Sequence, residues 1–269
     1  MSVETAVIDG RGVHRVNNTF VTDWRGLGGP GPRRVAAPAP RRHGLIESTS
    51  LYGPRVMPVL GWCGDTEDSG SAAVAAALTA FDALKGVLLA TASHLVVIRR
   101  RGRGADEQLV CRIAGDISDD VRGGGEVIEW GFELVASDPR LYGTTLNSQA
   151  RTNTGNIAVN HAGGNTDTPA FIEVHGPTSA GTLTLTNTTT GAAVVLASVN
   201  ALGGSESLHI DTQGRTVFED GDDLFHPEYV DASATDWWEL IPGGNTIAVA
   251  GTAIQAGTTT TVRWRDARI

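Results

Sequence analysis

The sequence predicts a mainly β protein built from two domains, of which the first carries a single α-helix. The chain has 269 residues, which is enough for two ordinary domains. Glycine is abundant, at 34 residues, and Thr and Val recur in short runs separated by Gly, Asn and Asp. This texture is typical of short strands joined by turns. The pattern stops at Asp138-Pro139. We therefore expect a first domain over residues 1–142, a linker or first strand over 143–168 and a second domain over 169–269.

The first domain opens with strand-like residues and then changes character. The run at 5–8 is followed by the turn signal Asp9-Gly10, and residues 13–24 again have strand-like content. Residues 27–44 are rich in Gly, Pro and Arg. Because proline lacks the amide donor of a central strand, we expect an extended, partly polyproline-like loop that is mobile or lies against a partner.

Residues 66–85 predict the helix of this domain, at about 68–85. Thr66 or Asp68 is suited to the N-cap, with Ser69 and Ser71 as rivals, and Gly86 is suited to the position after the helix. The alanine-rich run between them has high helix propensity. The apolar stripe expected to face the core consists of Val74, Leu78, Phe81 and Leu84.

Alternating residues predict the remaining strands. In the first domain these are 94–101, 108–115 and 126–136, with a hairpin loop after Arg101 and a mobile glycine tip after Arg122. In the second domain about eight short strands follow at roughly ten-residue spacing. They are expected at 170–174, 183–186, 193–197, 208–211, 216–218, 238–241, 246–250 and 259–264. Because no helix lies among them, they must pack sheet against sheet as a β-sandwich.

The charge of the chain disfavours a nucleic-acid-binding protein. The formal net charge is −9, whereas such proteins bind phosphates through an excess of Lys and Arg. Arginine runs at 33–34, 41–42 and 99–101 lie in the first half. We interpret them as solvated hairpin tips or as ion-pair donors at an interface.

No motif for catalysis, cofactor binding or metal binding is found, so no catalytic, cofactor-binding or metal-binding residues are expected and the protein is predicted not to be an enzyme. Cys63 and Cys111 lack a metal-ligand spacing and are expected to be buried, reduced thiols. The seven histidines show no paired-ligand spacing. The acidic run at 219–223 is interpreted as a solvated turn. Trp237-Trp238 is interpreted as one core and one opposite-face residue, with a sugar-stacking platform as the alternative.

The N-terminus lacks the features of a signal peptide, and no uninterrupted apolar run approaches 18 residues. We therefore expect no membrane span and assembly in a cytoplasm.

Two parts of the chain resemble the distal tail proteins of long, non-contractile-tailed bacteriophages, the siphovirus tail component family. Residues 129–142, EWGFELVASDPRLY, resemble the signature W-x-F-x-L-x-A-x-D-P-x-x-Y that closes the N-terminal domain of that family. Residues 208–215, 238–245 and 262–264 resemble segments of its C-terminal domain, in the same order and with the same spacing. The resemblance spans residues 45–269, and the segment 27–44 has no match in it.

This resemblance implies a structural virion protein of the tail tip, also called the baseplate. The implied fold is an N-terminal β-sandwich or split barrel with one helix, followed by a galectin-like β-sandwich. The implied assembly is a homo-hexameric ring that lines the DNA ejection path, with DNA only in transit. Its implied partners are the tail tube protein, the tail-tip hub protein and the tape-measure protein, with a receptor-binding protein or host surface glycan as a further candidate. A carbohydrate-binding module and a β-rich glycosidase at the host cell surface remain the alternatives.

Overall fold

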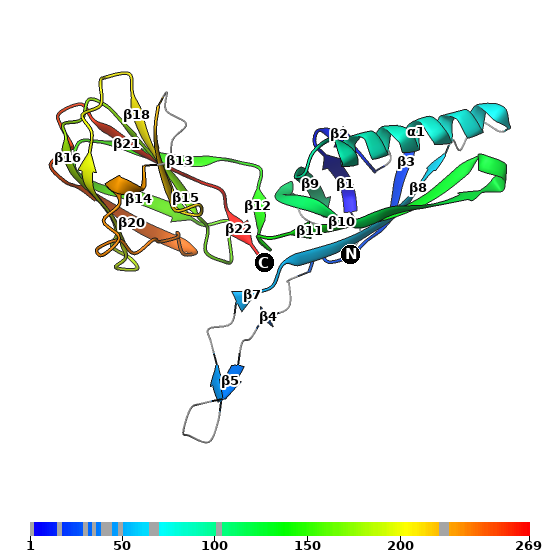
Figure 1. The fold of residues 1–269 in the computed structure, drawn as a ribbon, viewed down its shortest axis with the longest axis horizontal. Helices are drawn as coiled ribbons and strands as arrows, with labels where there is room; N and C mark the ends of the chain where they lie inside the picture. The colour runs from blue at the N-terminus through cyan, green and yellow to red at the C-terminus, as the bar shows by residue number, and fades with distance from the viewer. Residues whose placement is uncertain are drawn as a thin grey trace. The chain divides into compact units, whose positions relative to one another are not determined.

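The computed structural model describes residues 3–14, 18–28, 32–33, 36–38, 45–47, 51–64, 70–100, 104–220 and 226–269. The chain divides into two compact units (Figure 1). The first unit holds Met1–Thr144 together with Ile269, and the second holds Thr145–Arg268. The protein is mainly β, as predicted, with one long helix.

The first unit is built on one sheet whose strands follow the order β2-β1-β9-β10-β11-β8-β3, with β12 paired to β10. Every pairing along this path is antiparallel. The strands of this unit are β1 (Val3–Ile8), β2 (Arg11–Gly12), β3 (Thr19–Trp24), β8 (Arg55–Gly64), β9 (His94–Arg100), β10 (Glu107–Arg122), β11 (Val127–Ala136) and β12 (Leu141–Gly143). The short strand β22 (Ala267–Arg268) belongs to the second unit.

Strand β10 joins the two halves of this sheet. Residues 107–111 pair with β9, and residues 112–122 pair with β11. At 16 residues it is much longer than the strand expected at 108–115, and the glycine tip after it is a short 3₁₀ turn, η1 (Gly123–Gly125). The register shift between Ala114 and Ser118 marks a bulge, the kind of irregularity that lets one strand bend between two parts of a sheet.

Strand β8 was not among the strands expected from the sequence. Its residues alternate between buried and more exposed positions, with Met57, Val59 and Cys63 fully buried. Pro58 argues against a central strand when the sequence is read alone. In the structure Pro58 lies opposite Glu133 of β11, and its carbonyl accepts a hydrogen bond from the Arg25 amide just beyond β3, at 3.1 Å.

Helix α1 (Ser71–Ala90) packs on β8 and β11. It runs through Gly86, so the prediction that this glycine follows the helix is wrong. The predicted stripe is also only partly right: Phe81 and Leu84 are buried, but Leu78 is 47% exposed. Alanines at 73, 77 and 80 take the buried positions instead, because small side chains let the helix lie close to the sheet. The proposed caps at 66, 68 and 69 lie outside the described residues, and Gly70 occupies the N-cap without a side-chain cap.

The segment 27–44, expected to be an extended loop, contains two short strands that pair with strands following it. Strand β4 (Pro32–Arg33) pairs with β7 (Leu51–Tyr52), and β5 (Ala36–Pro38) pairs with β6 (Leu45–Glu47). Each pair forms a two-stranded antiparallel ribbon. A proline is compatible with this arrangement because a strand with only one neighbour leaves one of its edges without ladder hydrogen bonds.

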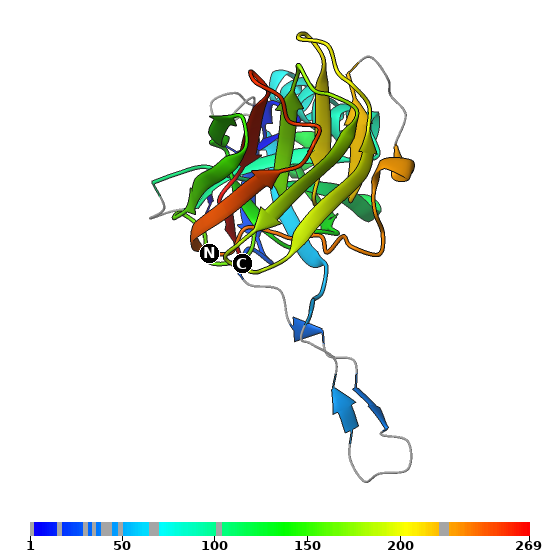
Figure 2. The same cartoon turned by 90° about the vertical axis from the view of Figure 1, so that its left-hand side faces the viewer.

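The second unit is a β-sandwich of two antiparallel sheets (Figures 1 and 2). Side chains from both sheets meet in one hydrophobic cluster. The five-stranded sheet has the order β13-β21-β15-β18-β19, and the four-stranded sheet has the order β14-β20-β16-β17. Their bounds are β13 (Asn147–Thr152), β14 (Gly155–His161), β15 (Ala170–His175), β16 (Gly181–Asn187), β17 (Ala193–Val199), β18 (Ser207–Asp211), β19 (Thr216–Glu219), β20 (Gly243–Ala250) and β21 (Thr259–Trp264).

Two details of the second unit differ from the sequence expectations. Residues 143–168, expected to be a linker or a first strand, contain two strands, β13 and β14, which pair with β21 and β20. Residues 238–241 do not form a strand, and only Leu240 makes an isolated bridge, to Thr168. The segment contributes to the core through the buried side chains of Trp238 and Leu240, without the backbone pairing of a strand.

Candidate functional site

The first unit carries most of the exposed apolar side chains. Nine large hydrophobic residues are exposed in the described part of the chain, and seven of them belong to this unit. They are Val56, Leu60, Leu78, Leu89, Leu95, Val110 and Val121, and we call them the apolar set. Leu89 on α1 is the most exposed, at 72%. Leu95 and Val110 lie opposite each other on β9 and β10, and exposed apolar groups that lie next to one another are typical of a surface that a partner covers.

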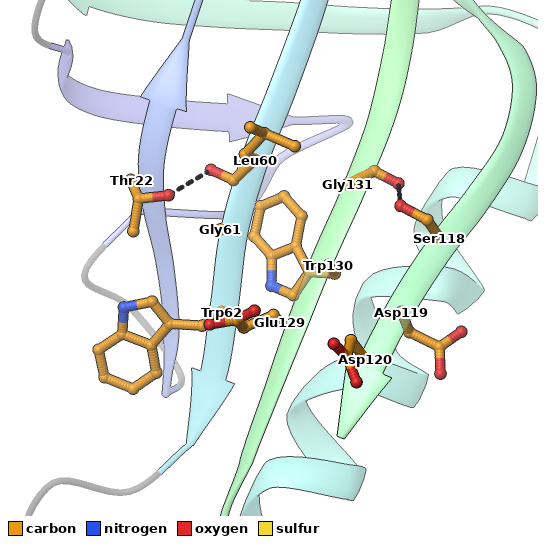
Figure 3. A pocket seen from close by; sticks show the side chains of 10 residues that line it. All are labelled: Thr22, Leu60, Gly61, Trp62, Ser118, Asp119, Asp120, Glu129, Trp130 and Gly131. Atoms are coloured by element: carbon orange, nitrogen blue, oxygen red, sulfur yellow. Dashed lines mark hydrogen bonds between the residues drawn. The ribbon is translucent and has the colours of Figure 1, made fainter. Parts of the chain in front are cut away.

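Part of this set borders a hollow on the sheet. Four neighbouring strands, β3, β8, β11 and β10, contribute side chains to a hollow of about 410 Å³ (Figure 3). Leu60 and Trp62 of β8 lie on one side and Asp120 of β10 on the other, with Glu129 of β11 beside Trp62, its cross-strand partner. The Trp62 ring stacks on Phe20, with the ring centroids 4.1 Å apart. The hollow therefore joins an aromatic surface to an acidic one.

Glycines shape this hollow. A Cβ on Gly61 would lie 2.3 Å from Cζ2 of Trp130, so the indole occupies the space beside the glycine. A Cβ on Gly131 would lie 2.7 Å from Cδ2 of Leu60. The Ser118 hydroxyl donates to the Gly131 carbonyl at 3.1 Å (Figure 3). The absence of side chains at both glycines lets large neighbours lie flat against the strands.

The same sheet has two open edges. Strand β3 ends the strand order and pairs only with β8 among the described residues. On β10, β9 covers only residues 107–111, so the edge of residues 112–122 that faces away from β11 has no strand partner in the described chain. Unpaired edges expose backbone donors and acceptors that are ready to pair with another chain.

Two buried arginines hold the segment that leads into the β4–β7 ribbon. Arg55 is 1% exposed and donates from Nε to the Pro139 carbonyl, at 2.7 Å, and from Nη1 to the Gly26 carbonyl, at 2.8 Å. It also donates to the Gly28 carbonyl. Arg100 donates from Nη1 to the Leu27 carbonyl at 3.0 Å. Three successive carbonyls are thus bound by two guanidinium groups, which we call the arginine anchor.

The Glu107 carboxylate pairs with the Arg100 guanidinium of the arginine anchor. Glu107 accepts two hydrogen bonds from Arg100, at 2.6 and 2.7 Å, and both side chains are buried. Burial, followed by the Arg100 charge, lowers the pKa of Arg55, while Glu107 acts in the opposite direction. The prediction that the 99–101 run is a solvated tip or an interface donor is therefore wrong for Arg100. Arg99 is half-exposed and pairs with Asp106 at 2.7 Å, and Arg101 lies outside the described residues.

The Asp138-Pro139 motif forms a turn between β11 and β12, stabilised by hydrogen bonds to the Asp138 carboxylate. Asp138 accepts hydrogen bonds from the Arg140 backbone amide at 3.1 Å, from Arg140 Nε at 2.9 Å and from the Tyr142 hydroxyl at 2.5 Å. Burial alone would raise the pKa of Asp138, but these hydrogen bonds and the Arg140 charge hold it below its usual value. The motif therefore has a structural role in stopping one strand and starting the next.

This geometry predicts how Asp138 contributes to stability. Because its pKa is lower in the folded than in the unfolded chain, the stabilisation is present above the unfolded pKa of about 3.9 and is lost as the pH falls through the folded value. We expect Asp138→Asn to lower the free energy of unfolding by about 1–3 kcal/mol at pH 7, with a smaller difference from the parent at pH 3. Urea unfolding at the two pH values measures this. A difference that grows on acidification would contradict the prediction.

The motif residues of the second unit are also structural. Trp238 is buried, and its Nε1 donates to the Leu185 carbonyl at 3.0 Å, which confirms a core role for this tryptophan; Trp237 is half-buried against the same core. Buried Asn245 accepts from the Ile241 amide at 3.1 Å and donates to the Ile241 carbonyl at 2.8 Å. Val262 and Trp264 belong to the core cluster. These residues specify the fold and present no exposed chemistry.

Two histidines near the acidic run each pair with one carboxylate. His209 pairs with Asp220 at 2.6 Å, and His226 pairs with Glu228 at 2.7 Å. No group of three or more metal-ligating residues occurs in the described chain. Most of the acidic run at 219–223 lies outside the described residues. Cys63 and Cys111 are buried free thiols, as predicted, and burial raises the pKa of Cys111 to about 12.

Helix α1 is long and apolar enough to cross a membrane, with a mean hydropathy of 1.7 over 18 residues. The sequence expectation considered only uninterrupted apolar runs and did not identify it. One such helix is weak evidence for a span, because core helices pass the same test. Phe81, Leu84 and Leu88 of α1 are packed in the core of the first unit.

Comparison with known proteins connects this architecture to phage tails. Residues 163–267 match the family described as siphovirus-type tail component, C-terminal domain. No curated protein matches the chain by sequence. The fold resembles that of the SPP1 Dit (gp 19.1) protein, described as a paradigm of the hub adsorption apparatus in phages that infect Gram-positive bacteria. That match has a TM-score of 0.66 and 13% identity and covers 97% of each chain.

Two further matches are chains of the phage P2 baseplate in its activated conformation. The structure with Ca has a TM-score of 0.51 and 8% identity, covering 91% of this chain and 89% of that chain. The structure with Sr has a TM-score of 0.53 and 8% identity, covering 97% and 98%. The resemblance to siphovirus tail components is thereby confirmed, by family over residues 163–267 and by fold over the whole chain. These findings support a structural role in a phage tail or baseplate.

Proposed function

We propose that this chain forms a closed, homo-hexameric ring at the phage tail tip, in the virion, through its first unit. The observation that carries the proposal is the concentration of seven of the nine exposed large hydrophobic residues in that unit. The tail-component family match and the shared fold support the setting. The number six comes from the family resemblance.

The two open edges suggest how neighbouring copies join. Along β10-β11-β8-β3 every pairing is antiparallel, so β3 and β10 run in opposite directions. The open edge of β3 in one copy can therefore pair antiparallel with the open edge of β10 in the next. The two surfaces differ, and a head-to-tail contact of this kind closes into a ring when the rotation between copies allows it.

The ring would connect the tail tube protein to the tail-tip hub protein and surround the path along which DNA is ejected, near the tape-measure protein. A passage that is neutral or acidic would let DNA slide, because it offers no cations to pair with the phosphates. Around the hollow on the sheet, Asp119 accompanies Asp120 and Glu129. Arg122 pairs with Asp120 at 2.6 Å and with Glu129 at 3.5 Å, so this surface is neutral to acidic, which supports such a passage. We propose assembly in the cytoplasm of the host bacterium and no enzymatic activity.

The experiment that tests edge pairing compares two exposed apolar residues. Val121 is 57% exposed and lies on the open part of β10, whereas Leu146 is 53% exposed and lies in the second unit, outside the apolar set. Lysine on an open edge blocks pairing with another chain. We expect Val121→Lys to weaken assembly at least tenfold, measured by native mass spectrometry and mass photometry over a concentration series, and Leu146→Lys to assemble as the parent does.

The parent chain should give a hexamer and ring-shaped particles in electron micrographs. A parent chain that stays monomeric at all concentrations would contradict the ring proposal. A ring that forms equally well with Val121→Lys would leave the ring intact but rule out the β3–β10 contact. Circular dichroism of both variants establishes that they fold, because each substitution replaces an exposed side chain.

A further inference from the structure

The outer face of the five-stranded sheet in the second unit gathers charged and aromatic side chains. On β15, alternation directs Phe171, Glu173 and His175 away from the core, while Ile172 and Val174 are buried. The register places Arg263 of β21 opposite Phe171, and His209 and Ser207 of β18 opposite Glu173 and His175. Ser207 is buried, at 2% exposure, and we call the other five residues the polar face: Phe171, Glu173, His175, His209 and Arg263.

The hydrogen-bonding groups of the polar face are held in place by one another. Arg263 Nη2 contacts Glu173 Oε2 at 2.5 Å. The Ser207 hydroxyl lies 3.4 Å from Glu173 Oε1 and 3.0 Å from His175 Nδ1. The Glu173 side chain is only 21% exposed, so its carboxylate cannot swing away freely. The result is a line of planar polar groups whose directions are set before any ligand arrives.

An aromatic ring lies directly beside these groups. Phe171 is 39% exposed, and its ring stacks on that of His209 with the centroids 5.6 Å apart and the planes 26° apart. His209 is held in turn by Asp220, at 2.6 Å from Nε2. Of the exposed large hydrophobic residues described in the second unit, only Leu146 accompanies Phe171. A ring kept exposed and oriented by a polar neighbour offers a flat apolar platform.

The strands of the opposite, four-stranded sheet lack comparable charged and aromatic side chains on their outer face. Strands β14, β16, β17 and β20 contain no acidic, basic or large aromatic residue apart from His161, which is buried and paired with Asp266 at 2.7 Å. Their outward positions carry small uncharged residues such as Asn156, Thr184 and Ala248. General solvation would distribute polar groups over both faces, so the one-sided gathering points to a ligand.

The arrangement matches a saccharide better than a protein or an ion. A sugar presents an apolar C–H face that stacks on an aromatic ring, and adjacent hydroxyls that bind planar carboxylate and guanidinium groups in pairs. Arg263 and Glu173 neutralise each other, which disfavours a strongly charged ligand. A protein interface would need a larger apolar centre than one phenylalanine. We propose that the polar face binds a neutral saccharide, with Phe171 as the stacking platform and Glu173 and Arg263 as hydroxyl partners.

The test uses the full-length chain on a glycan array that carries neutral and acidic oligosaccharides. We expect binding to neutral glycans, and at least a tenfold loss of apparent affinity for Phe171→Ala and for Glu173→Gln. Glu173→Gln keeps the shape of the side chain but removes the charge that fixes Arg263. The matched control is Leu146→Ala, which removes the other exposed apolar side chain of this unit, at 53% exposure, and should bind as the parent does.

Three outcomes would overturn the proposal: no neutral glycan bound above background, binding restricted to acidic glycans, or binding unchanged in both Phe171→Ala and Glu173→Gln. Circular dichroism of each variant separates loss of the site from loss of the fold. The proposal does not depend on ring formation. The Val121→Lys chain should keep the same glycan specificity with weaker overall binding, because fewer linked sites reduce avidity.

Discussion

Glu107→Gln is expected to lower the free energy of unfolding of the first unit by about 3–5 kcal/mol, because removing one partner of a buried pair leaves an uncompensated charge. Glu107 is the carboxylate that pairs with Arg100 in the arginine anchor, and both side chains are nearly inaccessible. Arg55 is also buried nearby and adds a second positive charge. Without Glu107, two guanidinium groups would share a buried site from which the carboxylate that pairs with Arg100 is missing.

The matched control for this variant is the neighbouring pair. Asp106→Asn breaks the contact between Asp106 and Arg99, whose side chains are 34% and 42% exposed. We expect a loss of less than about 1 kcal/mol there, because solvent screens the pair. Urea unfolding followed by hydrogen-exchange mass spectrometry reads out β8 and β9 separately from the second unit, whose peptides serve as an internal reference. Similar losses for the two variants would contradict the importance assigned to burial.

Gly26→Ala should be the second severe substitution, with a loss of about 2–5 kcal/mol. Gly26 has a φ of +77°, a backbone conformation that costs an L-residue about 1–2 kcal/mol. A Cβ at this position would also lie 2.0 Å from the Val56 carbonyl oxygen. Relieving this overlap requires movement of β8 or of the segment held by Arg55, which costs about another 1–3 kcal/mol.

Gly10→Ala separates the two contributions. Gly10 has a similar φ, +82°, but a Cβ there meets nothing within 4 Å. It should therefore lose only the conformational part, about 1–2 kcal/mol. Thermal and urea unfolding of the two variants side by side measure the difference, which isolates the overlap with β8. Equal losses in Gly26→Ala and Gly10→Ala would show that the segment at 26–28 is free to move.

The limits of the sequence reading are clearest at β8. Arg55, Met57 and Val59 alternate as a strand should, but Pro58 and two glycines obscure the pattern. The strand forms because β11 and β3 pair with it from both sides, at separations of about 70 and 40 residues along the chain. The alternation is present in the sequence, but a proline inside it weakens it as evidence for a central strand.

Helix α1 shows a related limit. Its high alanine content predicts a helix, but the apolar stripe does not reveal which face meets the sheet, because alanines occupy several faces at once. In the structure Ala73, Ala77 and Ala80 are buried, whereas the larger Leu78 is half-exposed. Two histidine pairs between distant residues also escaped the sequence reading: Asp9 and His94 lie 85 residues apart in the chain, and His161 and Asp266 lie 105 apart. No local spacing could have indicated these two pairs.

Local sequence patterns are sufficient to predict a mainly β protein with one helix, the end of a strand at Asp138-Pro139 and two buried cysteines. These properties follow from alternation, turn residues and helix propensity, which act over a few neighbouring residues. The folded structure is needed to show that Arg100 lies in the core, that β3 and part of β10 have open edges, and that one sheet of the second unit bears the polar face. Burial, edges and cross-strand neighbours depend on which distant segments meet.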